Sequence, residues 1–349
     1  MSFGRSARVD IVMELHKVIC FEVEPWEQEF LKDKLQHKVE LEFFNHRLSY
    51  DNIHEAATAD YIVSFIYSDL SHLVLTHLNK VKGIATMSVG VDHIDLGEAA
   101  SRHIVVSNVP AYGPNTVAEH TVALLLAMSR KIVESVERTR DGVYEYTGLS
   151  GWDLSGKTLG VVGTGKIGAH VAQIAHGLDM KLIGSDPHPN TELTEKLGIE
   201  YMPLNDVLGK ADVITVHVPL KPENKYMLST ELFKLMKKGG VILNTSRGGL
   251  IDASALLTAL DDGTVAQAGI DVLEDEGLLK EEKEFFSPYF KLKDYQMAMA
   301  DHALMRHPHV LLTPHNAFNS KESMHNILNT TIENIEGMVS GDPINTVST

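Results

Sequence analysis

A glycine-rich turn between a strand-like run and a helix-like run limits the possible folds of this chain more than any other feature. An apolar run from residue 159 leads into the spacing G-x-G-x-x-G at Gly163, Gly165 and Gly168, and a helix is expected over 166–176. These glycines allow a tight turn, close approach of the backbone to a pyrophosphate, and close packing of helix on strand. The turn therefore predicts a parallel α/β sheet whose helix N-terminus faces a dinucleotide.

An acidic residue follows at the position that binds the ribose hydroxyls in such a site. The next expected strand, 181–185, ends just before Asp186, which lies 18 residues beyond Gly168. A carboxylate there can accept hydrogen bonds from both ribose hydroxyls and would repel a 2′-phosphate. We therefore expect NAD rather than NADP. There are two separate alternatives: the glycine turn could be purely structural, and Asp186 could be a turn residue before Pro187.

Strand-like and helix-like segments alternate along most of the chain, which is the rhythm of a parallel sheet covered by helices. Pro25 suits a helix start, Asn115 a helix N-cap, and Gly263 the position after a helix end. At 349 residues the chain is long enough for two domains. We expect the α/β class, with two Rossmann-like doubly wound parallel-sheet domains. Strands are expected at 18–23, 39–44, 59–66, 83–87, 104–107, 159–162, 181–185, 213–217, 241–244 and 266–271, and helices at 26–35, 115–136, 166–176, 229–236 and 252–260.

The region 277–309 breaks this rhythm. It holds a run of alternating charges, an aromatic cluster and a Met-rich piece, without a clear strand. We expect a long loop with helical turns that lies over the domain as a lid or an interface. A decorated surface loop is the alternative.

Composition excludes several classes of protein. The formal net charge of −16 argues against binding to nucleic acid or to an anionic membrane surface. The single cysteine, Cys20, allows no intramolecular disulfide and no Cys-rich metal site, so no metal is expected. No apolar run reaches the length of a membrane span, and the N-terminal residues lack the apolar core of a signal peptide. A cytoplasmic protein is expected.

Three polar residues at separate segment ends have complementary chemistry. Arg247 closes an expected strand, Glu276 lies five residues after Asp271, and His315 follows a Thr-Pro pair. An Arg offers a planar fork of donors to a carboxylate or carbonyl, a His passes a proton, and a Glu fixes the ring tautomer of that His. Reduction of a 2-keto acid uses all three groups. Each could instead be an ordinary exposed or core residue, and Glu274 or Glu282 could take the place of Glu276.

Several stretches match a known pattern in order and spacing: 87–95, 109–120, the glycine turn, 217–220, 244–248, 268–276 and 313–318. On these stretches the chain resembles the D-isomer-specific 2-hydroxyacid dehydrogenases over about 18–345, and within them the branch that forms D-lactate. The step of 29 residues from Arg247 to Glu276 also matches that family.

The resemblance implies a role for each matching residue. His315 would donate a proton to the keto oxygen, Glu276 would be its partner, and Arg247 would bind the substrate carboxylate and carbonyl and contact the cofactor. The substrate would also meet the amides of Val89 and Gly90, with Tyr112 and Phe318 lining its pocket. The remaining NAD contacts would be Gly163, Gly165, Lys166, Ile167, Gly168, Asp186, Val218, Pro219, Asn224, Thr245, Ser246 and Asp271.

The resemblance also implies the domain order and the partners. A substrate domain would comprise 1–112 and 317–349, discontinuous in sequence, with an NAD-binding domain at 113–316 between its two parts. The helix that starts near Asn115 resembles the dimer-interface helix of the family, so a homodimer is expected. Pyruvate is the expected substrate. A bulkier 2-keto acid, glyoxylate or hydroxypyruvate, and a corepressor-like protein that senses NAD, remain alternatives.

Overall fold

The computed structural model describes residues 15–274, 276 and 292–347, and the chain divides into two compact units. Unit 1 comprises Met1–Tyr112 and Lys321–Thr349, and unit 2 comprises Gly113–Ser320. Unit 1 is therefore discontinuous. The segment 317–320, which we assigned to the substrate domain, belongs to unit 2.

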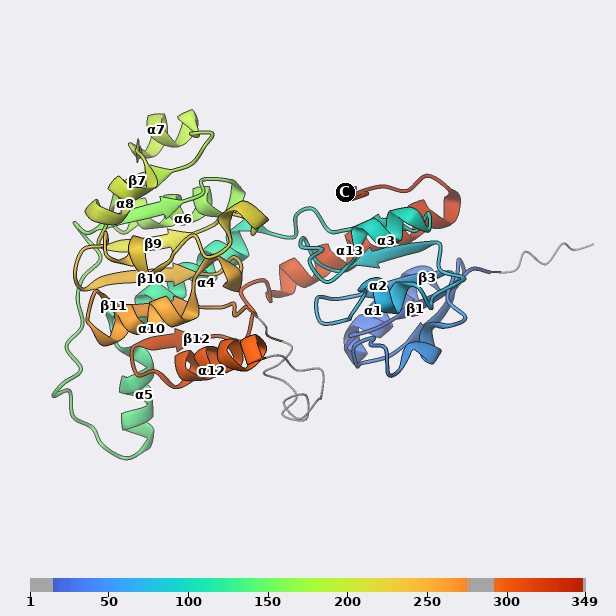
Figure 1. Ribbon diagram of the computed structural model, residues 1–349, viewed down its shortest axis with the longest axis horizontal. Helices are drawn as coiled ribbons and strands as arrows, with labels where there is room; N and C mark the ends of the chain where they lie inside the picture. Colours follow the sequence, from blue (N-terminus) through green and yellow to red (C-terminus); the bar gives the residue numbers. More distant parts are fainter. Residues whose placement is uncertain (1–14, 275, 277–291, 348–349) are drawn as a thin grey trace, which may run out of the picture. The chain divides into compact units, whose positions relative to one another are not determined.

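Unit 2 contains a seven-stranded parallel sheet with the strand order β12-β11-β10-β9-β6-β7-β8 (Figure 1). The order reverses between β6 and β9, and this is the place where doubly wound sheets open a crevice at the carboxyl ends of the strands. The expected fold class is confirmed. The strands are β6 (Thr158–Val162), β7 (Lys181–Ser185), β8 (Glu200–Tyr201), β9 (Val213–Val216), β10 (Gly240–Asn244), β11 (Val265–Ile270) and β12 (Val310–Leu312).

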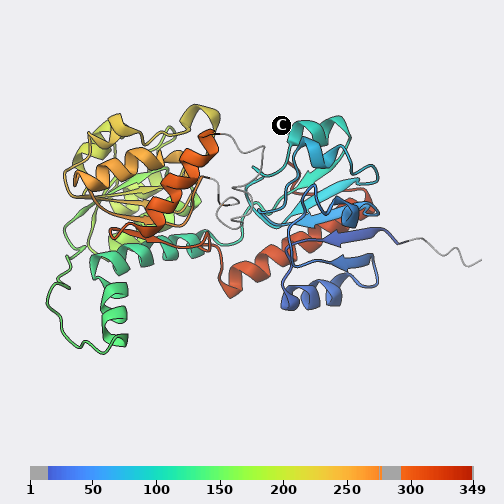
Figure 2. The same ribbon diagram turned by 60° about the horizontal axis from the view of Figure 1, so that its bottom comes forward.

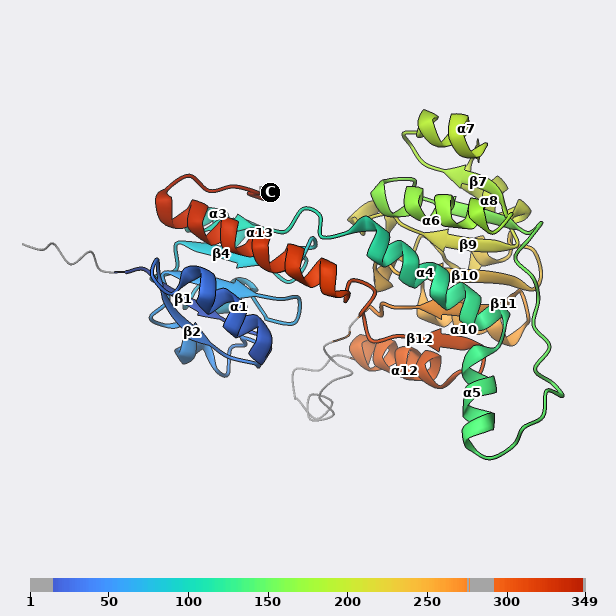
Figure 3. The same cartoon turned by 180° about the vertical axis from the view of Figure 1, so that it is seen from behind.

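Helices cover both faces of this sheet. Figure 1 shows α10 and α12 in front of the strands, and α4 and α6 cover the opposite face in the view from behind (Figure 3). In the part of the chain that the structure describes, none of the helices is long and apolar enough to cross a membrane. The helices of unit 2 are α4 (Pro114–Ser129), α5 (Ile132–Arg140), α6 (Lys166–Gly177), α7 (Thr191–Leu197), α8 (Leu204–Lys210), α9 (Thr230–Phe233), α10 (Ala253–Asp261) and α12 (Leu292–Arg306).

The helix expected over 115–136 is two helices. Lys131 adopts a left-handed backbone with φ of 50°, and this ends α4 and starts α5 in a new direction (Figure 2). The predicted N-cap was also wrong, because α4 begins at Pro114 with Gly113 as its N-cap and Asn115 lies inside the helix. Pro114 fits the first turn because its fixed φ suits a helix and it needs no N–H partner there.

The prediction for 277–309 was partly wrong. Residues 277–291 lie outside the described residues, but the Met-rich piece forms the continuous helix α12 and is followed by the edge strand β12. The helix expected over 229–236 is only the single turn of α9. The predicted helix starts and ends elsewhere hold: α1 has Pro25 in its first turn, and Gly263 follows α10 with φ of 72°.

Unit 1 contains a five-stranded parallel sheet with the order β2-β1-β3-β4-β5. This order reverses between β1 and β3. There, Glu22 has a left-handed backbone, and its carboxylate accepts hydrogen bonds from the amides of Phe65, Tyr67 and Ser68. The elements are β1 (Lys17–Cys20), α1 (Pro25–Leu35), β2 (Glu40–Phe43), β3 (Tyr61–Ser64), α2 (His72–Leu75), β4 (Gly83–Thr86), α3 (Leu96–Ser101), β5 (Val105–Ser107) and α13 (Lys321–Ser340).

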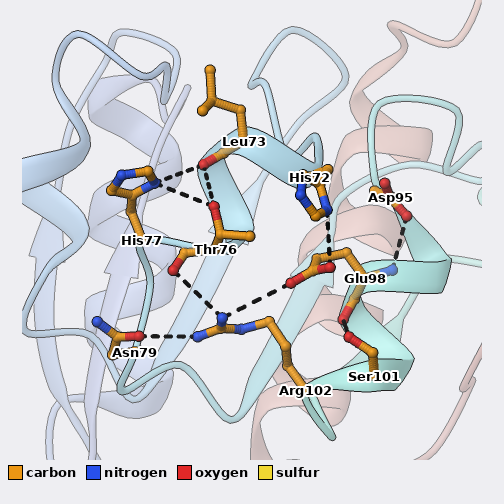
Figure 4. A network of polar contacts seen from close by, with 9 residues as sticks. All are labelled: His72, Leu73, Thr76, His77, Asn79, Asp95, Glu98, Ser101 and Arg102. Carbon is orange, nitrogen blue, oxygen red and sulfur yellow. Dashed lines mark hydrogen bonds and ion pairs between the residues drawn. The ribbon is translucent and has the colours of Figure 1, made fainter.

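A polar network ties the short helices α2 and α3 together on one side of this sheet (Figure 4). The Arg102 guanidinium donates to the carbonyl of Thr76 and to Asn79 Oδ1, and Glu98 Oε2 lies 2.9 Å from His72 Nδ1. Asp95 caps α3 by accepting from the amide of Glu98. These contacts hold two helices that are too short to be stable alone.

The last part of the chain returns to complete unit 1. Helix α13 packs on β4 and α1, and the hydroxyl of Tyr61 donates to the carbonyl of Met338. Beyond the helix, Ser107 pairs with Thr346 in an antiparallel bridge beside β5. The edge strand β5 is therefore covered by residues more than 200 positions further along the chain.

Candidate active site

The glycine turn has the shape that the sequence predicted. Gly163 has φ of 89°, and a Cβ on Gly168 would stand 2.0 Å from the carbonyl oxygen of Gly163. Only glycine fits at either position. A Cβ on Gly165, by contrast, would meet nothing within 4 Å, so the outer side of the turn is open at the start of α6. This open backbone at a helix N-terminus suits a pyrophosphate.

Asp186 is fixed at the end of the neighbouring strand β7. Its Oδ2 accepts from the amide of Thr164 at 2.7 Å and from the Thr164 hydroxyl at 3.1 Å, and its Oδ1 accepts from the amide of His188. Burial alone would raise the pKa of Asp186, but these donors outweigh it and hold the pKa below its ordinary value. The residue therefore presents an ionised carboxylate beside the glycine turn.

Two residues that contact this site, Thr164 and Tyr201, were not predicted from the sequence. The Tyr201 hydroxyl donates to the Thr164 hydroxyl at 2.9 Å, and Thr164 in turn bonds Asp186. Thr164 lies between two glycines of the motif, and this position could have singled it out. No local signal marks Tyr201, because it joins the site only through the pairing of β8 with β7.

Most of the other residues assigned to NAD lie in the segments that follow β9 and β10. The hydroxyl of Ser246 donates to the carbonyl of Val218, and the amide side chain of Asn224 donates to the carbonyl of Pro219. Thr245 is buried against Thr121 of α4, with 2.7 Å between their hydroxyl oxygens. Lys166 and Ile167 form the exposed and half-buried first turn of α6.

Arg247 follows β10 at the same edge of the sheet. Its carbonyl accepts from the side chain of the buried Asn244, and its guanidinium donates to the carbonyl of Ser246 at 2.8 Å. The next residue, Gly248, lies against the main chain of Leu273, since a Cβ there would stand 2.1 Å from the Leu273 carbonyl carbon. The segment that carries Arg247 is therefore held against the segment that leads to Glu276.

The structure pairs His315 with Glu276 rather than with Glu274. His315 Nδ1 lies 2.7 Å from Glu276 Oε2, and Glu276 Oε1 accepts from the amide of Leu273. Glu274 instead bonds Lys225 and Tyr226. Since Nδ1 faces the carboxylate, Nε2 is the ring nitrogen that remains to meet a substrate.

Asp271 is 1% exposed and holds the loop that carries His315. Its carboxylate accepts from the amides of Asn316 and Ala317 and from the hydroxyl of Thr313. His120 of α4 lies 3.0 Å from that hydroxyl. These contacts fix a loop in which His315 has a left-handed backbone, with φ of 51°. The contact of His120 was not predicted from the sequence, although its partner Thr313 stands in the same Thr-Pro-His motif as His315.

The residues assigned to the substrate are divided between the units. Phe318 belongs to unit 2, whereas Val89, Gly90 and Tyr112 belong to unit 1. Val89 and Gly90 follow β4, and their carbonyls accept from the side chains of Asn108 and Ser88. The carbonyl of Tyr112 accepts from the side chains of Ser323 and Asn326 at the start of α13.

Within unit 2, the open glycine turn, the Asp186 carboxylate, Arg247 and the His315–Glu276 pair all follow carboxyl ends of strands in one sheet. A dinucleotide fits the turn and the carboxylate. Arg247 can bind an anion, and the imidazole can move a proton. This set of groups is that of a dehydrogenase that acts on a carboxylate-bearing substrate.

Comparison with known proteins gives the same class. The D-isomer specific 2-hydroxyacid dehydrogenase NAD-binding domain matches residues 122–317. The chain is 37% identical to the D-lactate dehydrogenase of Escherichia coli over 87% of this chain and 90% of that protein. The chain therefore belongs to the D-isomer-specific 2-hydroxyacid dehydrogenase family and is an NAD-dependent enzyme of that family.

Solved structures agree with this assignment. The structure of the pyruvate reductase of Chlamydomonas reinhardtii superimposes with a TM-score of 0.84 at 36% identity, covering 95% of this chain and 98% of that one. The D-lactate dehydrogenase of Aquifex aeolicus, solved with NAD and lactic acid, gives a TM-score of 0.83 at 32% identity, covering 93% and 96%. NAD is the cofactor that the family and these structures support.

Proposed function

We propose that this chain reduces pyruvate to D-lactate with NADH. The observation that carries the proposal is the 2.7 Å contact between His315 Nδ1 and Glu276 Oε2, because it leaves Nε2 to serve the substrate. NADH would supply the hydride when bound. The carboxylate of Asp186, the open turn at Gly165 and the first turn of α6 would hold it.

The proton-transfer step is assigned to His315. The Nε2–H of the ring donates a proton to the keto oxygen as hydride reaches the keto carbon, and Glu276 stabilises the imidazolium that carries this proton. Arg247 holds the substrate carboxylate and orients the carbonyl. The amides of Val89 and Gly90 and the side chains of Tyr112 and Phe318 keep the substrate roles that the family resemblance implies. The D stereochemistry rests on that resemblance alone.

Replacement of His315 by Gln tests the assignment. Since a general acid contributes about 10²–10⁴-fold, we expect kcat for pyruvate to fall by at least about a hundredfold. The dissociation constant of NADH, measured by fluorescence titration, should change less than about twofold, because the proposal gives His315 no role in NADH binding. A variant that keeps more than a third of the parent turnover would overturn the role of His315.

A panel of 2-keto acids assayed with NADH tests the substrate. We expect the highest kcat/KM for pyruvate, with lower values for bulkier keto acids, glyoxylate and hydroxypyruvate. A higher value for one of these would replace pyruvate. A chain that binds NADH but oxidises it with none of them would favour the corepressor-like alternative.

We also propose a homodimer. Among the apolar residues 124–128 of α4, Leu124, Leu125 and Met128 are buried inside unit 2, whereas Leu126 is 39% exposed. Helix α5 has no buried residue, and it exposes Ile132, Val133 and Val136. Tyr144 and Tyr146 in the following loop are 94% and 88% exposed. An apolar strip of this kind on a projecting helix is typical of a protein interface, and a second copy of the chain is the partner we assign to it.

A further inference from the structure

A lysine and a tyrosine without a role in the proposed chemistry bind the carboxylate of Glu274. The Tyr226 hydroxyl lies 2.8 Å from both Oε1 and Oε2 of Glu274, and Lys225 Nζ lies 2.7 Å from Oε1. The Lys225 ammonium also stands 4.9 Å from the centre of the Tyr226 ring. The Glu274 side chain is only 15% exposed, so this carboxylate is held in one place.

The main chain of Tyr226 is bonded to the segment that follows Arg247. The amide of Tyr226 donates to the carbonyl of Gly249 at 2.8 Å, and the residue has a left-handed backbone with φ of 54°. Such a backbone is uncommon for a residue other than glycine and persists where the surrounding contacts impose it. Tyr226 therefore makes its main-chain contact with one catalytic segment and its hydroxyl contact with the other.

The two catalytic segments are themselves in contact. The backbone of Gly248 approaches Leu273 so closely that no side chain fits between them, and the amide of Leu273 donates to Glu276 Oε1. The orientation of the Glu276 carboxylate toward His315 therefore depends on where the residues 273–274 lie. Glu274 is the side chain that fixes them to Tyr226.

We propose that Tyr226 is a positioning residue that holds the Glu276–His315 pair and the Arg247 segment in register. The inference rests on the proposed function of His315 and Glu276. The ammonium group of Lys225 balances the negative charge of the Glu274 carboxylate. The Glu276–His315 pair therefore has no uncompensated carboxylate two residues before Glu276.

The hydroxyl of Tyr226 stays a donor over the working pH range. Burial raises the pKa of Tyr226, and the hydrogen bond to Glu274 raises it further. The hydrogen bond to Glu274 likewise raises the pKa of Lys225, so that the lysine stays charged. Both contacts to Glu274 therefore persist at neutral pH.

The variant Tyr226→Phe removes only the hydroxyl. We expect kcat for the keto acid to fall about tenfold, because small displacements of catalytic groups cost one to two orders of magnitude. The dissociation constant of NADH should change less than about twofold, and KM for the keto acid less than kcat. Tyr50→Phe is the matched control, since it removes the hydroxyl of a tyrosine of unit 1 that is 46% exposed and has no part in the proposed site or interface, and it should keep full activity.

A conservative pair of variants separates positioning from general destabilisation. Glu274→Gln keeps an acceptor for the Tyr226 hydroxyl and should retain more kcat than Glu274→Ala. A Tyr226→Phe variant with kcat within twofold of the parent would overturn the inference. Equal losses in Glu274→Gln and Glu274→Ala would do the same.

The same assays keep this inference distinct from the proposed function. If His315→Gln is inactive and Tyr226→Phe is fully active, only the positioning role fails. If His315→Gln itself retains turnover, the catalytic assignment fails, whatever the outcome at Tyr226.

Discussion

Gly248 lies where the segment that carries Arg247 contacts the segment that leads to Glu276, and no side chain fits at this contact. A methyl group there would stand 2.1 Å from the carbonyl carbon of Leu273 and 2.4 Å from the amide nitrogen of Glu274. Both are main-chain atoms, so no side-chain rotation can relieve the clash. Gly248→Ala must therefore displace either Arg247 or the main chain of Leu273 and Glu274. We expect kcat to fall by about a hundredfold with a lower melting temperature.

Gly209→Ala is the matched control for this change. Gly209 lies inside α8, where an added Cβ would come no closer than 3.6 Å to any neighbour. Alanine is favoured over glycine in a helix by about 1 kcal/mol, so the variant should melt at the same or a higher temperature and keep its activity. Full activity in Gly248→Ala, measured beside this control, would contradict the close contact.

Some single residues could be assigned from the sequence and others could not. Arg247 and His315 stand in motifs whose spacing points to them. Residues 274 and 276 are both glutamates, and their spacing in the sequence does not show which of them pairs with His315. The choice depends on Tyr226, Lys225 and the amide of Leu273, which are brought together only by packing.

At the scale of elements, Asp212 joins the starts of three neighbouring strands. Its carboxylate accepts from the amide of Thr158 at the start of β6 and from Lys237 ahead of β10, and Asp212 itself precedes β9. Burial alone would raise the pKa of Asp212, but the Thr158 amide and Lys237 outweigh it and keep the pKa below its ordinary value. The ionised carboxylate therefore stabilises the folded state.

The pH dependence of Asp212→Asn follows from that direction. The folded-state pKa is lower than the unfolded one, so the stabilisation is present above the ordinary pKa of Asp and is lost as the pH falls through the folded value. We expect the variant to lose about 1–3 kcal/mol of unfolding free energy at pH 7, measured with urea, and less below pH 4.

Glu231→Gln serves as the control for this experiment. Glu231 is exposed, and among the described residues its ion pair is with Lys234, the C-cap of α9. Its replacement should therefore change stability by less than about 0.5 kcal/mol. A loss at Asp212→Asn that stays constant down to pH 3 would show that the carboxylate charge is not the cause.

Elements with strong periodicity were predictable, and the exceptions have physical reasons. Strand β6, before the glycine turn, and strand β7, after helix α6, are apolar runs bounded by turn residues. Both form where expected. The break between α4 and α5 was not predicted, because helical residues continue through it and only the left-handed Lys131 turns the chain. Helix α12 was missed because its apolar residues show no regular spacing.

At the scale of the whole molecule, the exposed strip on α5 predicts self-association. Val136→Asp places a charge in this strip, and a charge buried at an interface without a partner is costly. We expect the dissociation constant of the dimer to rise at least about tenfold in sedimentation velocity experiments at several protein concentrations. Glu134→Lys changes a charge at an exposed position two residues before Val136, on the other side of the same helix, and should leave association unchanged.

Two results would contradict this assignment. A parent chain that is monomeric at all concentrations would remove the dimer. An unaffected Val136→Asp dimer would place the interface elsewhere.

The division of the chain into units was the feature least accessible from composition or periodicity. Length suggested two domains, but only the resemblance to a family implied that one of them is interrupted by the other. The alternation of strands and helices runs through both units without a change that marks the first boundary near Tyr112.

The interruption of unit 1 sets the order in which the protein can be completed during synthesis. Helix α13 and the strand-like residues beside β5 leave the ribosome only after all of unit 2. Until then the face of β4 on which α13 packs is bare, and β5 lacks its bridge partner. Domains usually fold in the order of their synthesis. Here the second unit in the chain can finish folding first, while the N-terminal strands wait for the last helix.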